Sequence, residues 1–245
     1  MRKCAFVPVD DKHYYAEGTP IMINSFKKFH PDVDLIVFRQ DVADKLFKEK
    51  RLDWYKAKPF FAELLEPYYD LIVNMDADHI VLGRMTEVFD NFDYDIAGPK
   101  NFNDYENMSI ENVTEEMYIQ GGLIASTSHE FWKAWREENH DVRRYKGREN
   151  DIMNLVIYNK VPHLKFKMLD GEKDYYGCKS LNREGEFYVE GDKTMCRNEQ
   201  VILYHYARGG VFPKLDIPNM PLSDEVKKRW LEIGNYGQSY KAVAI

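Results

Sequence analysis

The stretch Leu71-Ile-Val-Asn-Met-Asp76-Ala-Asp78-His-Ile-Val-Leu82 decides the fold of this chain. Its apolar, Ile- and Val-containing start predicts a buried strand over residues 71–75. Asp76 and Asp78 follow directly, and in extended backbone two residues that are two positions apart point to the same face. Buried carboxylates are costly unless they are paired or bind a cation. The stretch therefore predicts a divalent-metal site at the carboxyl end of a strand, where open α/β sheets bind their ligands.

The Asp-x-Asp spacing alone is weak evidence, because the chain contains it three times. Asp32 and Asp34 follow a proline, and we expect them to cap a turn into the next strand. Asp93 and Asp95 are expected at a solvated loop end. Only the pair at positions 76 and 78 ends a fully apolar strand, so only this pair is a metal-site candidate.

The pattern around this strand predicts an α/β fold with a doubly wound, Rossmann-like sheet. Strands are expected over residues 4–9, 35–38, 71–75 and 80–82, with one helix from Thr19-Pro20 to His30-Pro31 and another after Pro59. This βαβαβ order is typical of a parallel start. Further strands are expected over 118–125, 164–169 and 201–204, and further helices after Ser128 and over 151–158 and 224–231.

Composition excludes several classes of protein. The formal net charge of −7 argues against non-specific binding to nucleic acid, because proteins that bind in this way usually carry an excess of basic residues. Three scattered cysteines, with no paired Cys-x-x-Cys, argue against a disulfide framework or a zinc site, so a reducing, cytoplasmic location is expected. No apolar stretch approaches 18 residues and the start lacks the core of a signal peptide, so neither a transmembrane segment nor a secretory leader is expected.

Other segments carry candidate chemistry. His205 follows a predicted strand, and imidazole is a common metal ligand as well as a common structural group. The Arg208-Gly209-Gly210 run after it offers a cation and backbone N–H groups suited to phosphate. Glu149 opens a helix, where the helix dipole alone accounts for an acidic residue. Glycines at 121 and 122 interrupt a predicted strand, which suggests close approach of a ligand or of another segment.

Taken together, and in their order along the chain, the motifs resemble those of the retaining GT-A glycosyltransferases of the glycogenin and bacterial lipopolysaccharide galactosyltransferase family. The resemblance covers roughly residues 3–215. It rests on Tyr15-Ala-Glu-Gly18, Lys58, Asp76-Ala-Asp78, Gln120-Gly121-Gly122, Glu149-Asn150-Asp151-Ile-Met-Asn154 and His205-Tyr-Ala-Arg208-Gly209.

The resemblance implies a UDP-sugar donor, with UDP-glucose or UDP-galactose favoured, and a Mn²⁺ cofactor, with Mg²⁺ as the alternative. Asp76, Asp78 and His205 would be the metal ligands, a mixed oxygen and nitrogen set that suits Mn²⁺ better than Ca²⁺. Asp151 would bind donor hydroxyls or stabilise the cationic sugar, with covalent attack as a lesser alternative, and Asn150 stands where the family has Gln. The expected donor-binding residues are Val9, Asp10, Tyr15, Lys58, Ala77, Gln120, Gly121, Arg208 and Gly209.

Within that set, Val9, Asp10 and Tyr15 would hold the nucleobase and ribose, and Lys58 and Arg208 would approach donor hydroxyls or phosphates. The family's Gly-x-x-Lys-Pro-Trp ending is absent, which puts a phosphate contact by Lys214 in doubt. The implied organisation is a single GT-A domain over residues 1–245, built on a doubly wound mixed sheet. It would have a nucleotide-sugar and metal half over 1–82 and an acceptor half over 83–245.

The acceptor is expected to be a glycan or another hydroxyl compound, selected by the polar segments 100–116 and 170–198. A homodimer is compatible with the resemblance, and the oligomeric state stays open. Two other functions are kept. A catalytically silent sugar-nucleotide or glycan-binding protein is considered because Asn150 replaces the family's Gln, and a sugar nucleotidyltransferase is the weaker alternative because the segment after the first strand lacks a Gly-rich loop.

Overall fold

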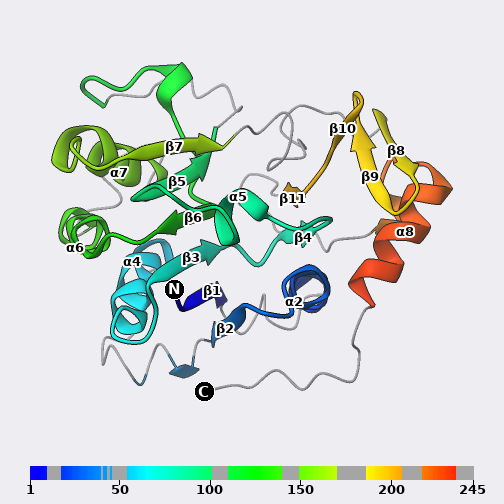
Figure 1. Ribbon diagram of the computed structural model, residues 1–245, viewed down its shortest axis with the longest axis horizontal. Helices are drawn as coiled ribbons and strands as arrows, with labels where there is room; N and C mark the ends of the chain where they lie inside the picture. Colours follow the sequence, from blue (N-terminus) through cyan, green and yellow to red (C-terminus); the bar gives the residue numbers. More distant parts are fainter. Residues whose placement is uncertain are drawn as a thin grey trace.

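A six-stranded mixed sheet forms the centre of the protein (Figure 1). The computed structural model describes residues 1–9, 18–39, 41–42, 45, 54–100, 110–139, 149–169, 186–205 and 217–235. In spatial order the strands are β2 (Asp34–Arg39), β1 (Lys3–Val9), β3 (Leu71–Met75), β6 (Leu123–Ser126), β5 (Ile96–Pro99) and β7 (Phe166–Leu169).

The first three strands form the parallel arrangement that the sequence predicts. β1 pairs in parallel with β2 on one side and with β3 on the other. β6 runs antiparallel to both β3 and β5, and β5 is again parallel to β7. The expected doubly wound, mixed sheet is therefore confirmed. Because β6 is antiparallel to β3, its first residue pairs with the last residue of β3, Met75.

Helices cover both faces of the sheet, so successive side chains of a strand enter different cores. Cys4 and Phe6 of β1 pack in one core with α4 (Trp54–Leu65), α6 (His129–Glu138) and α7 (Glu149–Leu155), which lie together to the left of the sheet in Figure 1. Ala5 and Val7 pack in the other core with α2 (Gly18–Phe29) and α5 (Thr86–Phe89). α7 continues as a π-helix over Val156–Lys160.

A second region lies to the right of the central sheet in Figure 1. It contains the antiparallel pair of β4 (His79–Val81) and β11 (Leu203–His205), and a three-stranded sheet of β8 (Phe187–Glu190), β9 (Lys193–Cys196) and β10 (Glu199–Gln200). Helix α8 (Asp224–Gly234) packs on this sheet through Trp230, whose indole N–H donates to Thr194 Oγ1 over 3.1 Å. Short 3₁₀ turns occupy Glu115–Met117 and Ile217–Asn219.

Three differences from the sequence-based expectation concern α4 and the central sheet. α4 begins at Trp54 and contains Pro59 in its interior, whereas the helix was expected only after the proline. The strand expected over 118–125 is shorter, because Gly121 and Gly122 form a turn and pairing begins at Leu123. β5 was not expected at all, because a four-residue Ile-Ala-Gly-Pro run carries two residues that are unfavourable in strands.

None of the helices in the described ranges combines the length and apolar character that a bilayer span requires.

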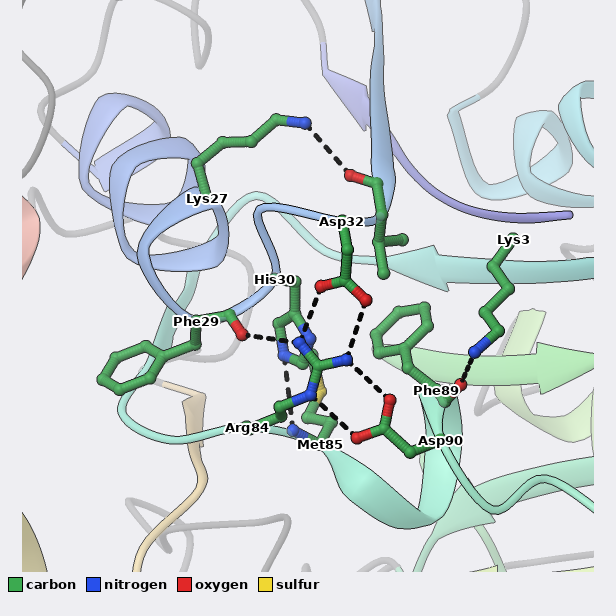
Figure 2. Close-up of polar contacts among 10 residues, drawn as sticks. Lys3, Lys27, Phe29, His30, Asp32, Arg84, Met85, Phe89 and Asp90 are labelled. Carbon is green, nitrogen blue, oxygen red and sulfur yellow. Dashed lines mark hydrogen bonds and ion pairs between the residues drawn. The ribbon is translucent and has the colours of Figure 1, made fainter.

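A polar cluster joins the end of α2 to α5 (Figure 2). The Arg84 guanidinium lies 2.7 Å and 2.9 Å from the two carboxylate oxygens of Asp32, and 2.6 Å and 2.8 Å from those of Asp90. It also donates to the carbonyl of Phe29 over 3.1 Å. The first of the three Asp-x-Asp pairs therefore contributes to a structural ion-pair network.

His30 lies buried beside this cluster (Figure 2). Its ring is 4.9 Å from that of Phe26 and 4.8 Å from that of Phe89, and its Nε2 accepts from the Met85 N–H over 3.3 Å. Burial, with the nearby Arg84 charge, lowers the pKa of His30 to about 3 despite the opposing carboxylates of Asp32 and Asp90. His30 is therefore neutral in the folded protein at neutral pH.

We expect His30 to destabilise the fold progressively as the pH falls below the ordinary histidine pKa of about 6.5. Between about pH 6.5 and pH 3 the unfolded chain binds a proton at this position and the folded chain does not, so protonation favours unfolding. Urea unfolding of the wild type and of His30→Gln, whose amide oxygen retains an acceptor, measures this term. From pH 7 to pH 5 the wild type should lose about 2 kcal/mol more than the variant.

The same two proteins provide the control at pH 8 and pH 7, where both should change equally because His30 is neutral in both states. Equal losses between pH 7 and pH 5 would contradict the assignment.

Candidate functional site

The candidate site lies where β3 ends. Every residue of β3 is buried, and Asp76-Ala-Asp78 forms the turn that leads into β4. The side chains of Asp76 and Asp78 are 26% and 10% exposed, so both are partly removed from water. The Asp76 N–H donates to the Gly122 carbonyl over 2.8 Å, which fixes the turn against the segment that precedes β6.

His205 reaches this turn through the β4–β11 pair, whose strands lie side by side (Figure 1). The register places His205 opposite His79, the residue after Asp78. As a result, His205 Nε2 lies 3.0 Å from Asp78 Oδ1. The structure thus brings His205 to two aspartates that precede it by more than 120 residues in the sequence.

Asp76, Asp78 and His205 have the geometry and chemistry of a cation site. One ligand atom from each lies within 4.8 Å of the others. Ligands about 2.1 Å from one ion lie at most about 4.2 Å apart, so movements of about half an ångström would close the group on a shared ion. Two carboxylates and an imidazole form a set that suits first-row divalent metals.

Gly122 leaves the room that such an ion would need. A Cβ at this position would lie 2.6 Å from Gln120 Oε1 and 3.2 Å from both Asp76 Oδ2 and His205 Cε1. A side chain on residue 122 would therefore enter the space between the carboxylate and the imidazole. The close approach of Gln120, Asp76 and His205 accounts for this glycine, in line with the close approach of a ligand or another segment that the sequence suggested.

The Asp78–His205 contact is an ion pair. Burial alone would lower the pKa of His205, but the Asp78 carboxylate raises it above its ordinary value. Burial alone would raise the pKa of Asp78, but the His205 charge lowers it. Each group thus stabilises the charged form of the other, which offsets the cost of burying both.

Lys58 supplies the second cation of the site. Its Nζ lies 2.8 Å from Asp76 Oδ1 and 3.9 Å from Glu149 Oε1, and it donates to the Gly121 carbonyl over 3.0 Å. Only 6% of the residue is exposed. Burial opposes its charge, but Asp76 and Glu149 outweigh burial and raise the pKa of Lys58 above its ordinary value. Lys58 is therefore a buried ammonium held between two carboxylates.

The peptide groups of Gly121 form the wall next to Lys58. Asn74 Nδ2 also donates to the Gly121 carbonyl, over 3.2 Å, and Asn150 Oδ1 accepts from the Gly121 N–H over 3.0 Å. A Cβ on Gly121 would lie 2.6 Å from Asn150 Oδ1. The start of α7 is thereby fixed against the Gly121-Gly122 turn that precedes β6.

The two carboxylates of α7 face different surroundings. Glu149 faces Lys58, whereas Asp151 is 2% exposed and accepts a hydrogen bond from the Tyr118 hydroxyl over 2.6 Å. Farther along α7, Asn154 holds the backbone of Ile119 through two hydrogen bonds of 2.9 Å. Glu149 is the site residue that sequence reasoning set aside, because the helix dipole already explained an acidic residue there.

His79 is a further residue that the sequence did not single out. It is fully buried, its ring lies 4.4 Å from that of His205, and its Nδ1 lies 3.0 Å from the Asp76 carbonyl. Burial, followed by the charge of His205, holds the pKa of His79 well below its ordinary value. A neutral His79 can donate its Nδ1–H to that carbonyl and brace the turn. Its position directly after Asp78, at the start of β4, was the available signal.

Comparison with solved structures identifies the fold, whereas comparisons of sequence find no match. No family model matches the chain, and no curated protein matches it. Among solved structures, the bifunctional glycosyltransferase WbbM has a TM-score of 0.62 and 14% identity over 96% of this chain and 50% of WbbM, so the chain spans about half its length. The galactosyltransferase LgtC, solved with donor and acceptor sugar analogues, has a TM-score of 0.55 and 16% identity over 94% of both chains. This chain has the GT-A fold.

The glycosyltransferase GlyE of Streptococcus pneumoniae TIGR4 gives the same result, with a TM-score of 0.55 and 12% identity over 96% of this chain and 61% of that one. The GT-A fold that the motif order implied is confirmed. At these identities the likeness concerns the fold alone.

The structure gathers most of the expected site residues that it describes. Val9 is the last residue of β1, at the end of the sheet where β3 also ends, and Ala77 lies between Asp76 and Asp78 in the turn after β3. The Gln120 side chain accepts from the Gly122 N–H. Four expected donor-binding residues, Asp10, Tyr15, Arg208 and Gly209, lie outside the described residues.

We expect Gly122→Ala to weaken divalent-cation binding by at least about tenfold, about 1.4 kcal/mol, because the new methyl group would occupy the space between Asp76 and His205. Titration of Mn²⁺, followed by the loss of the free-ion electron paramagnetic resonance signal, measures this. Gly83→Ala is the control, since its methyl group would meet only the side chains of Gln200 and Ile202. A Gly122→Ala protein with wild-type affinity would show that the cation binds elsewhere.

Proposed function

We propose that the protein is a metal-dependent, retaining glycosyltransferase that moves a hexose from a UDP-sugar to a hydroxyl group of a glycan or another acceptor. The observation that carries the proposal is the convergence of Asp76, Asp78 and His205 in a GT-A fold. UDP-glucose and UDP-galactose are the favoured donors, in line with the motif resemblance and with the named activity of LgtC.

Asp76, Asp78 and His205 would hold the cation, with Mn²⁺ first and Mg²⁺ as the alternative. A bound divalent ion supplies Lewis-acid stabilisation of the negative charge that develops on the leaving diphosphate. Lys58 adds a fixed ammonium beside the Asp76 carboxylate. Its low exposure to water strengthens its electrostatic interactions. Val9 and Ala77 lie at the strand ends, where a nucleotide would be held.

The sugar would lie against the start of α7. Asp151 remains the proposed group for stabilising the cationic sugar, and Asn150 is proposed to shape the pocket through its hold on the Gly121 N–H. Glu149 joins them, because it is the α7 carboxylate nearest to Lys58. Asp10, Tyr15, Gln120, Gly121, Arg208 and Gly209 stay proposed donor contacts.

Residues 1–82 and 83–245 are proposed as the nucleotide-sugar half and the acceptor half. The metal ligands come from both, since His205 is supplied by the second half.

Calorimetry of UDP binding with and without Mn²⁺ tests the proposal. The wild type should bind UDP in a Mn²⁺-dependent manner, and Asp76→Ala should lose at least about tenfold in affinity, or 1.4 kcal/mol, because it removes a metal ligand. Asp93→Ala is a matched control, because Asp93 begins another Asp-x-Asp pair and its side chain is 69% exposed. If Asp76→Ala binds UDP as well as Asp93→Ala does, the metal assignment is wrong.

Turnover separates catalysis from silent binding and tests Asp151. We expect the wild type to release UDP from a UDP-hexose, and Asp151→Asn, which keeps the shape that Tyr118 contacts, to lower kcat about 100-fold if the charge stabilises the transition state. Glu149→Gln is measured in parallel, and its main effect should be on KM for the donor.

A kcat for Asp151→Asn within about threefold of the wild type would mean that Asp151 serves only to anchor Tyr118. No turnover of any donor, together with Mn²⁺-dependent UDP binding, would favour a silent binding protein. Formation of UTP and hexose 1-phosphate from the UDP-hexose when pyrophosphate is added, in place of UDP, would identify a nucleotidyltransferase.

A further inference from the structure

We propose that Lys58 is the built-in counter-cation of the metal-free site, that it weakens divalent-cation binding at Asp76, and that Glu149 is the partner that accepts it when a cation binds. This inference rests on the proposed metal site and adds a determinant of its affinity.

The geometry places Lys58 and the cation on one carboxylate. Lys58 Nζ is 2.8 Å from Asp76 Oδ1, and the other oxygen of the same carboxylate, Oδ2, is the one on the side of Gly122. A divalent ion held by Asp76 would therefore lie close to a permanent positive charge. Because Lys58 is only 6% exposed, little water is available to screen that repulsion.

Glu149 offers Lys58 a way to relieve this repulsion. Its Oε1 lies 3.9 Å from Nζ, too far for a hydrogen bond but within reach of a small rotation of the lysine end. An ammonium has three N–H donors, and Asp76 and Gly121 receive two of them. Lys58 could thus shift from Asp76 to Glu149 while it keeps its bond to the Gly121 carbonyl.

Two single variants should therefore change affinity in opposite directions. Lys58→Met removes the competing charge and should tighten Mn²⁺ binding at least about tenfold. Glu149→Gln weakens the alternative partner, so Lys58 stays on Asp76 and Mn²⁺ binding should weaken at least about threefold. Both are measured without nucleotide, by the free-Mn²⁺ electron paramagnetic resonance signal and by the rise in Tm on adding Mn²⁺.

The double variant Lys58→Met/Glu149→Gln distinguishes a shift of Lys58 from simple loss of negative charge. If Glu149 acts through Lys58, Glu149→Gln should change Mn²⁺ affinity by less than about 1.5-fold when Lys58 is already Met. If the effect of Glu149→Gln is the same in both backgrounds, the partner role of Glu149 is wrong. Lys27→Met is the control for losing a partly buried lysine, since the Lys27 Nζ donates to a backbone carbonyl, that of Val33, over 3.1 Å.

The outcomes separate this inference from the proposed function. Tighter binding by Lys58→Met supports it, as does folding of that variant only when Mn²⁺ is present. Wild-type or weaker affinity of Lys58→Met overturns it and leaves the metal site in place. Failure of both the wild type and Lys58→Met to bind Mn²⁺, with or without UDP, would overturn this inference and the proposed metal site together.

Discussion

The buried ammonium of Lys58 is the interaction on which the site depends. One nitrogen connects α4 to the turn after β3 through Asp76, to the turn before β6 through Gly121, and to α7 through Glu149. A buried charge is tolerated only where partners surround it, and removing one partner of a buried pair usually costs several kcal/mol. The positions of these segments are therefore coupled through a single side chain.

The site balances its charges before any ligand arrives. Each aspartate of the turn has a cationic partner, Lys58 for Asp76 and His205 for Asp78. The partners differ in kind: an ammonium cannot ligate a metal, whereas a neutral imidazole can. The two carboxylates would therefore respond differently to a cation. His205, the partner of Asp78, would join the ligand set, whereas Lys58, the partner of Asp76, would lie beside a second positive charge.

The sequence was informative where chemistry and burial conflict. Asp76 and Asp78 could be singled out because two carboxylates at the end of an apolar strand require an explanation, and the same logic correctly left Asp32 to a structural role. The strand order through β3 followed from local patterns. The convergence of His205 on the turn was implied only by the motif resemblance, because spacing along the chain says nothing about which distant strands pair.

Other parts could not be predicted, for physical reasons. β5 is stabilised by its neighbours β6 and β7 rather than by its own residues, so a Gly and a Pro did not prevent strand formation. α4 continues through Pro59, which local propensity treats as a boundary, because tertiary packing of Phe61 and Leu65 outweighs it. The contact of Glu149 with Lys58 was missed, because the helix dipole already explained an acidic residue at the start of α7.

The β4–β11 pair has a consequence for how the protein acquires its chemistry. Since His205 pairs with His79, more than 120 residues earlier in the sequence, the proposed ligand set depends on a contact of very long sequence separation. Such contacts form late in folding, after the entropy of closing the loop between them has been overcome. During synthesis the aspartates emerge long before the imidazole, so a growing chain can build most of its central sheet and still lack the third proposed metal ligand. Competence to bind a cation with the full set thus reports that nearly the whole fold has assembled.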